Sequence, residues 1–154
     1  MKTTTPPELH LLASVVCEVG AVASLGSTAA GERRYVPLTG GSVGGEIEGR
    51  VVEGGIDWQW QRADGVLDIA AHYVIETREG ALIEVQSIGL RHGPPDVMAA
   101  LARGDAVAPE SYYFRTAIRF TTGHTRWQHL NRLLAIAVGR REARSVHLDV
   151  WRVG

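Results

Sequence analysis

Apolar and polar residues alternate with a period of two along most of the chain, which is the pattern of half-buried β-strands. The clearest example is residues 66–77, VLDIAAHYVIET, in which alternate residues from Leu67 onward are apolar or aromatic. After a short turn, residues 81–90 are expected to return as the partner strand of a hairpin. Further extended segments are predicted at residues 9–16, 35–38, 44–52 and 111–122, and in a closing hairpin at 132–140 and 145–153.

Three segments interrupt this alternation. Residues 23–34 are small and rich in glycine, which predicts a loop. The sequence PPDVMAALARG, beginning at Pro94, predicts one short helix that ends at Gly104, with Asp96 at its N-terminus. Residues 123–131 are expected to form an irregular or one-turn helical connection.

The number and spacing of the strands predict a mainly β fold. Eight or nine strands joined mostly by short turns favour a closed or nearly closed antiparallel β-barrel, because closure removes the open edges of a sheet. We expect one short helix outside this barrel, and an interior wide enough for side chains or for one small ligand. Residues 1–154 are interpreted as a single domain, with residues 1–7 as a flexible tail.

Composition and charge narrow the class of protein. The chain is 45% hydrophobic and carries 16 basic and 17 acidic residues, which gives no electrostatic reason to expect nucleic acid or anionic lipid as a partner. Cys17 is the only cysteine, so no internal disulfide can form and a reducing compartment is favoured. No segment approaches the roughly 20 apolar residues that span a membrane, and the N-terminus lacks a signal-peptide core. We therefore expect a cytoplasmic protein that binds neither nucleic acid nor membrane.

Several motifs occur in an order that is typical of one family. These are RYVPLTGG at residues 34–41, GRV at 49–51 and GGIDWQ at 54–59. The later segments that agree are residues 67–84, YFRT at 113–116, Trp127 and residues 130–131. Over residues 9–153 the chain resembles the DUF3237 family, also called UPF0311. The family is similar in architecture to lipocalin-like barrels, so the resemblance implies a calycin-like or lipocalin-like barrel and a candidate site more than a reaction.

Asp57 is the candidate catalytic residue. It follows the pair Gly54-Gly55 and lies between Ile56 and Trp58, where it could lose water on one side at the mouth of a barrel. Burial raises the pKa of a carboxyl, and a carboxyl tuned in this way can accept and return a proton near neutral pH. The alternative is that the Asp57 carboxylate accepts hydrogen bonds from backbone N–H groups of the glycine pair.

Cationic and aromatic side chains are candidates for holding a substrate. Arg34 and Arg115 could anchor a carboxylate, phenolate or enolate, since a guanidinium stays charged and presents a planar fork. Arg34 is ranked higher, because Arg115 lies on a face that looks solvated. Tyr73 and Tyr112 could present hydroxyl groups to the cavity, and Trp127 offers a rigid surface for an aromatic ligand. For all three aromatic residues, packing in the core is the alternative.

Two further polar residues complete the predicted substrate-binding set. Glu84 shares a strand face with Leu82 and Gln86 and would enter the cavity if that face lines the barrel. Asn131 could donate a hydrogen bond to a ligand carbonyl, although capping of the local turn explains it equally well. Strand alternation adds a condition on the neighbours of Asp57. If Asp57 points inward, Trp58 and Trp60 point outward or toward a partner subunit.

Motifs for metal and cofactor chemistry are not found. The spacing of the six histidines does not suggest a metal site, and the glycines of residues 40–55 follow neither P-loop nor dinucleotide-binding spacing. No G-x-S-x-G motif is present, and Cys17 has no histidine nearby in the sequence. We therefore expect no cofactor and no metal.

Three functions remain open. The first is a cofactor-independent acid/base enzyme of the isomerase, lyase or cyclase type that acts on a small apolar carbonyl or aromatic compound inside the barrel. The second is a non-catalytic carrier of such a compound. The third is a dimeric interaction module with a filled barrel, in which Trp58 and Trp60 form the contact of a homodimer. Fold alone does not choose among them.

Overall fold

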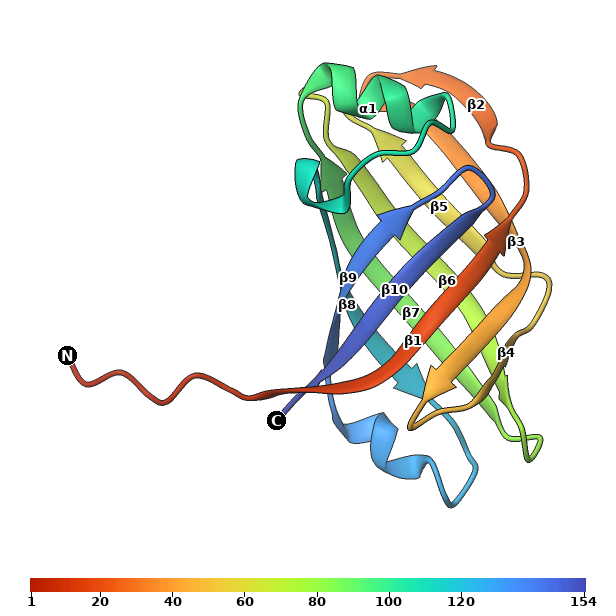
Figure 1. The fold of residues 1–154 in the computed structure, drawn as a ribbon, viewed down its shortest axis with the longest axis vertical. Coiled ribbons are helices and arrows are strands. Elements are labelled where there is room, and N and C mark those ends of the chain that lie inside the picture. The colour runs from red at the N-terminus through yellow and green to blue at the C-terminus, as the bar shows by residue number, and fades with distance from the viewer.

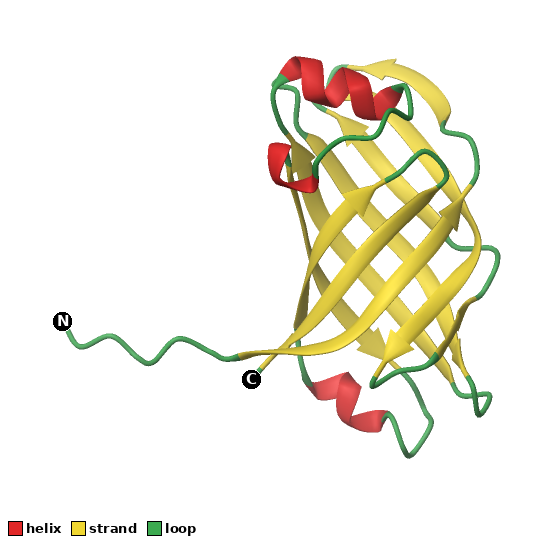
Figure 2. Cartoon of the chain, in the orientation of Figure 1, coloured by secondary structure: helices red, strands yellow, loops and turns green.

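The computed structural model describes residues 1–154 and contains one antiparallel sheet of ten strands (Figures 1 and 2). One α-helix, α1 (Pro95–Ala102), and two short 3-10 helices, η1 (Pro109–Ser111) and η2 (Gln128–Arg132), lie outside the sheet. The strands are β1 (Leu9–Val19), β2 (Ala23–Thr28), β3 (Gly31–Gly45), β4 (Gly49–Val51), β5 (Ile56–Gln61), β6 (Leu67–Thr77), β7 (Leu82–His92), β8 (Tyr113–Thr121), β9 (Ala135–Arg141) and β10 (Ser145–Val153).

The sheet closes on itself, which confirms the predicted barrel. Strand β1 pairs with β10 on one side and with β3 on the other. Strands β4 and β5 both lie between β3 and β6, so together they occupy one position in a ring of eight strands. Strand β2 pairs only with β3 and extends one end of the barrel. Figure 1 shows α1 and β2 at this end and η2 at the opposite end.

The prediction of a loop at residues 23–34 is wrong. These residues form β2 and the beginning of β3, which runs through 15 residues. Glycines hide the alternation here, because they carry no side chain yet occupy strand positions. Gly41 shows why glycine is needed: its φ is +138°, and a Cβ at this position would lie only 1.8 Å from the carbonyl oxygen of Val16.

The other predicted elements are found with small shifts. Residues 44–52, expected as one strand, form the end of β3 and the whole of β4, separated by a turn. Helix α1 begins at Pro95 and ends before Gly104, whose φ of +80° favours glycine. Asp96 lies in the first turn of α1 and makes no side-chain capping bond. None of the helices combines the length and the hydropathy that a membrane span requires.

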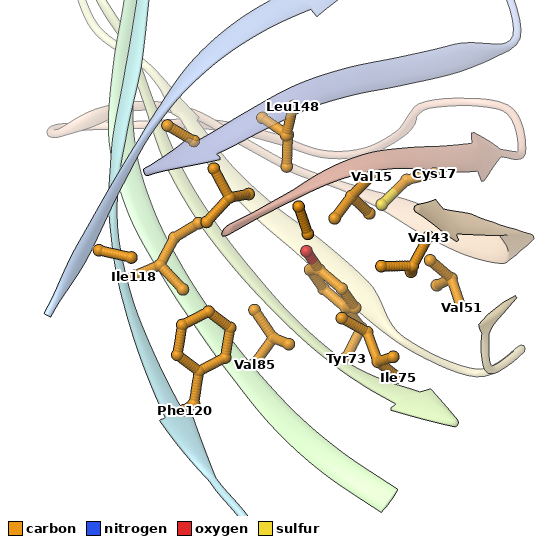
Figure 3. Close-up of a cluster of buried hydrophobic side chains, with 14 of the residues drawn as sticks. Val15, Cys17, Val43, Val51, Tyr73, Ile75, Val85, Ile118, Phe120 and Leu148 are labelled. Carbon is orange, nitrogen blue, oxygen red and sulfur yellow. The ribbon is translucent and has the colours of Figure 1, made fainter. Parts of the chain in front are cut away.

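The barrel end near η2 is filled by side chains. Trp127 and Leu130 are buried there, next to Phe120. Figure 3 shows part of the cluster further inside, where aliphatic side chains from several strands surround Tyr73 and Cys17. The labelled members are Val15, Cys17, Val43, Val51, Tyr73, Ile75, Val85, Ile118, Phe120 and Leu148. The opposite half of the interior, below α1, is less completely filled.

Gly139 on the inner face of β9 provides a test of this packing. A Cβ at this position would lie 2.6 Å from the Phe114 ring, so Gly139→Ala must displace the ring. We expect this substitution to lower the free energy of unfolding by about 1–3 kcal/mol, the usual cost of overpacking. Gly44→Ala is the matched control, because a Cβ at exposed Gly44 would meet nothing within 4 Å. Urea denaturation measures both variants, and an equal effect of the two would contradict the packing described for Gly139.

Candidate functional site

The barrel encloses a cavity of about 640 Å³ at the end covered by α1. Its walls are mainly apolar, and α1 contributes Met98 and Leu101 to its lining. Apolar strand residues in the wall include Val36, Leu38, Ile69, Ala71 and Phe114. A cavity of this size is typical of small-molecule sites. The barrel is therefore not filled, which removes one premise of the interaction-module hypothesis.

Strand β5 directs Asp57 and Gln59 into this cavity. The Asp57 carboxylate oxygen Oδ2 accepts a hydrogen bond of 2.7 Å from Nε2 of Gln59. Oε1 of Gln59 in turn accepts a hydrogen bond of 3.0 Å from Nε of Arg34. The chain from Arg34 through Gln59 to Asp57 fixes the position of the carboxyl, because each group in it is oriented by its neighbour.

The glycine pair before Asp57 has a different role from the predicted alternative. The Gly54 N–H donates to the carbonyl oxygen of Leu38, not to the Asp57 carboxylate. Gly54 has a φ of +110°, and a Cβ on Gly55 would lie 2.5 Å from the Cβ of Tyr73. Glycine is required here because the start of β5 passes very close to β6.

The environment of Asp57 raises the pKa of its carboxyl to about 6, mainly because burial penalises the charged form. The Gln59 hydrogen bond and the positive charges of Arg91, Arg141 and Arg34 act in the opposite direction and lower this pKa. At neutral pH the carboxyl is thus mostly ionised, while its pKa stays close enough to neutrality for proton exchange.

Arg91 and Arg141 are not among the residues predicted from the sequence, yet both line the cavity. Arg91 lies near the end of β7 and is only 8% exposed, and burial lowers the pKa of its guanidinium to about 10. Arg141 ends β9, and burial lowers its pKa as well. The sequence contains a pattern that could have identified them. Every second residue before each arginine on its strand is small or apolar and points inward, so the arginine at the end of this series points inward as well. On β7 this series is Ile83, Val85, Ser87 and Gly89.

Three buried side-chain nitrogen or oxygen atoms have no hydrogen-bond partner, and all three belong to residues that line the cavity. They are Oδ1 of Asp57, Nε of Arg91 and Oγ1 of Thr116. An unpaired buried donor or acceptor costs about 1–3 kcal/mol, so such groups are normally paired with protein, water or ligand. Their concentration in one cavity marks it as the candidate functional site.

Of the predicted substrate-binding residues, Arg34 and Tyr73 line the cavity together with Asp57. Tyr73 lies deep in the barrel, in contact with the thiol of Cys17. Burial raises the pKa of Tyr73 well above its usual value and that of Cys17 to about 12, so both stay protonated at neutral pH.

Glu84 and Arg115 lie outside the barrel, which corrects their predicted placement in the cavity. On β7, Ile83 and every second residue after it point into the barrel, so Glu84 faces outward. Its carboxylate lies 2.7 Å from Nε2 of His72. Arg115 is on the outer face of β8, with its guanidinium 5.2 Å from the centre of the Tyr113 ring.

Tyr112, Trp127 and Asn131 also lie outside the cavity lining, in structural positions. The Tyr112 hydroxyl accepts a hydrogen bond of 2.9 Å from the backbone N–H of Arg141, which anchors the end of β9 at the cavity rim. Trp127 is buried at the far end of the barrel, where Nε1 donates to the carboxylate of Glu79.

The Asn131 side chain closes the turn after β8. Its amide oxygen accepts a hydrogen bond from the backbone N–H of Thr122, and its amide nitrogen donates to the carbonyl oxygen of Thr122. Asn131 therefore caps the local turn, which is the alternative to a role in binding a ligand carbonyl. No group of three or more His, Cys, Asp or Glu side chains is arranged to hold a metal ion.

Trp58 and Trp60 lie on the outer face of β5, as alternation with inward Asp57 predicts. The guanidinium of Arg33 lies 4.9 Å from the Trp58 ring centre and 4.6 Å from that of Trp60. The two indoles thus bind a neighbouring cation from their own sheet. A homodimer formed through this face stays a prediction.

Comparison with known proteins agrees with this architecture. The family model described as "Protein of unknown function (DUF3237)" matches residues 7–153. The chain belongs to the DUF3237 family. The UPF0311 protein of Bradyrhizobium diazoefficiens is 37% identical over 140 residues, which cover 91% of this chain and 92% of that protein.

Solved structures share the barrel of this DUF3237 protein. A conserved protein of unknown function from Rhodopseudomonas palustris has a TM-score of 0.95 at 37% identity, covering 98% of this chain and 100% of that one. A β-barrel-like protein from Acinetobacter baumannii has a TM-score of 0.86 at 34% identity, with both chains covered completely. A structure described as an enzyme from Penicillium herquei has a TM-score of 0.75 at 25% identity, covering 100% of this chain and 99% of that one.

The raised pKa of Asp57 predicts a specific dependence of stability on pH. A neutral carboxyl is favoured in the folded state, so this stabilisation is complete below the unfolded pKa of about 3.8 and is lost as pH rises through about 6. Relative to Asp57→Asn, which does not titrate, the wild type should lose about 2 kcal/mol of unfolding free energy between pH 4 and pH 7. Urea denaturation at several pH values measures the difference. Asp96→Asn, at an exposed position where the side chain makes no capping hydrogen bond, is the control, and a pH-independent difference for Asp57→Asn would contradict the buried, raised carboxyl.

Proposed function

We propose that this DUF3237 protein is a cofactor-independent acid/base enzyme of the isomerase, lyase or cyclase type. Its substrate is a small, mainly apolar carbonyl or aromatic compound bound in the cavity below α1. The observation that carries the proposal is the convergence of the unpaired Asp57, Arg91 and Thr116 atoms in one largely apolar cavity. An apolar pocket with a few converging polar groups, one of them with a perturbed pKa, is the usual form of an active site.

Asp57 is assigned the role of proton acceptor and donor. The ionised carboxylate takes a proton from a carbon next to a carbonyl, and the C–H electron pair moves toward the carbonyl oxygen to give an enolate. Guanidinium groups near Asp57 stabilise the negative charge that develops on this oxygen. Return of the proton to another atom yields an isomer. Alternatively, the enolate carbon attacks a second carbonyl carbon of the same molecule, the π electrons of that carbonyl move to its oxygen, and this oxygen takes the proton back from Asp57 to give a ring. No other reactant is consumed.

The remaining residues of the hydrogen-bonded chain have a positioning role. Arg34 acts through Gln59, because its Nε bonds the Gln59 amide oxygen and leaves the amide nitrogen directed at Asp57. This arrangement holds one carboxylate oxygen and leaves the other without a protein partner. Tyr73, whose hydroxyl stays protonated, contributes to the floor of the cavity.

A carrier without catalytic activity is the second candidate, and the size and apolar walls of the cavity favour it. The proton-exchange chemistry available to Asp57 supports the enzyme over the carrier, because simple binding does not need a carboxyl whose pKa lies near 6. The resemblance to a Penicillium herquei structure described as an enzyme supports the same choice.

Deuterium exchange tests the proposed chemistry without knowledge of the natural substrate. The protein is incubated in D₂O with a panel of aryl ketones, cyclic ketones and 1,3-dicarbonyl compounds, and NMR follows loss of the acidic C–H signal. We expect catalysed exchange whose rate rises with pH through about 6 and then levels off, because the ionised carboxylate is the base. Asp57→Asn should reduce the catalysed rate by about 100-fold or more while the compound still binds. Binding without exchange in either protein would support the carrier instead.

Gln59 offers a second test that is specific to its effect on Asp57. The Gln59 hydrogen bond lowers the Asp57 pKa, so Gln59→Leu should move the midpoint of the pH–rate profile above that of the wild type. Gln86→Leu removes an exposed glutamine from the outer face of β7 and is the matched control. A lower rate with an unchanged midpoint would show that Gln59 contributes only to the fold.

A further inference from the structure

The guanidinium of Arg91 has no polar partner in the protein. Its Nε is buried without a hydrogen bond, and none of its nitrogens forms an ion pair with a carboxylate. The guanidinium makes a cation–π contact with the Phe114 ring, whose centre lies 5.5 Å from the guanidinium carbon. Arg91 is 8% exposed and lines the cavity. A buried charge in this condition is unfavourable unless another group pairs with it.

The cavity as a whole carries more positive than negative charge. Arg34, Arg91 and Arg141 all line it, and none of them forms a salt bridge. The carboxylates in the lining are Asp57 and Asp64, and Asp64 is paired with Arg62 outside this group. Three guanidinium groups thus share the single carboxylate of Asp57, which leaves an excess of two positive charges.

Thr116 adds an unpaired hydroxyl next to Arg91. On the paired strands β7 and β8, Phe114 is opposite Arg91 and Thr116 is opposite Gly89, so Thr116 is the diagonal inward neighbour of Arg91. Gly89 has no side chain that could separate the two groups. The Thr116 residue is 5% exposed, and its Oγ1 has no partner.

We propose that Arg91 and Thr116, with Arg141 nearby, form a subsite for a delocalised two-oxygen anion on the ligand, either a carboxylate or the enolate of a 1,3-dicarbonyl group. The planar fork of a guanidinium matches two oxygens in one plane, and charge-assisted hydrogen bonds of this kind are the stronger ones in proteins. The ligand is therefore an anion with an apolar body. The inference rests on the proposed function for the site and names the chemical class of its ligand.

The two faces of the site have separate roles in this account. Arg91 and Thr116 hold the anionic oxygens, and the apolar walls and α1 cover the rest of the ligand. Asp57 faces the same cavity from β5 and stays available for proton exchange. Binding of an anion also neutralises part of the excess positive charge, and this gain is absent for a neutral ligand of equal size.

The test compares ligands that differ only in charge. Isothermal titration calorimetry at pH 7.5 and low salt measures binding of 2-naphthoate and of neutral 2-naphthamide. We expect the wild type to bind naphthoate about tenfold or more tightly, which is the usual worth of a charge-assisted pair. Arg91→Gln should reduce this preference several-fold, and Arg115→Gln, which removes an exterior arginine, should leave it unchanged. Equal binding of the two compounds by the wild type, or an unchanged preference in Arg91→Gln, would overturn the subsite.

A second pair of compounds distinguishes the two anion classes. 1-Phenylbutane-1,3-dione forms an enolate and 4-phenylbutan-2-one does not to a comparable extent, so tighter binding of the dione with an enolate absorption band identifies the dicarbonyl class. Preference for naphthoate without enolate formation identifies the carboxylate class. If neither behaviour is observed, the proposal is overturned.

Two further variants keep the outcome decisive. If Arg91→Gln does not fold, Arg91→Lys retains the charge without the planar fork and Thr116→Val removes the hydroxyl at nearly constant volume. Each should reduce the anion preference several-fold, and an unchanged preference in both contradicts the subsite. Asp57→Asn separates this inference from the proposed function. It should keep or strengthen the preference for naphthoate, because it removes a negative charge, while it abolishes catalysed deuterium exchange.

Discussion

The carboxyl of Asp57 is buried in one end of a barrel, held by a 2.7 Å hydrogen bond from Gln59 and surrounded by three guanidinium groups. Burial alone would keep the carboxyl neutral, whereas full pairing with an arginine would lower its pKa and weaken it as a base. The opposition of these effects gives a pKa of about 6. The chemistry proposed for the site depends on this balance, because a general base must be ionised and still be basic enough to accept a proton.

The barrel interior is divided into a packed apolar end and an end that contains the cavity, and this division allows the fold to tolerate a buried carboxyl. Near η2 the inward side chains are apolar and close-packed, so the fold has a core that does not depend on the cavity. At the α1 end the same inward alternation brings Asp57, Gln59 and Arg91 together from β5 and β7. Tyr73 and Cys17 lie between the two halves, and both remain neutral. A stable core at one end thus permits unpaired polar groups at the other.

Much of this fold follows from the sequence, because strict alternation identifies strands and also places Asp57 and Trp58 on opposite faces. The phase of a strand is harder to predict when both faces carry apolar residues. On β7 the outward residue Ile88 is apolar although it is 63% exposed, so hydrophobicity alone does not predict that Glu84 faces outward. The inward orientation of Arg91 and Arg141 is difficult to predict from the sequence for a related reason. They extend an inward face at the end of a strand, where a charged residue is normally interpreted as the start of a loop.

The most direct test of the account is an NMR titration of the Asp57 carboxyl in ¹³C-labelled protein, with Asp57→Asn used to assign the signal. We predict a titration midpoint near pH 6, well above the value of an exposed aspartate. A midpoint near 4 would mean that the carboxyl is hydrated or fully paired, and it would contradict the claim that this cavity holds a base tuned for proton exchange near neutral pH.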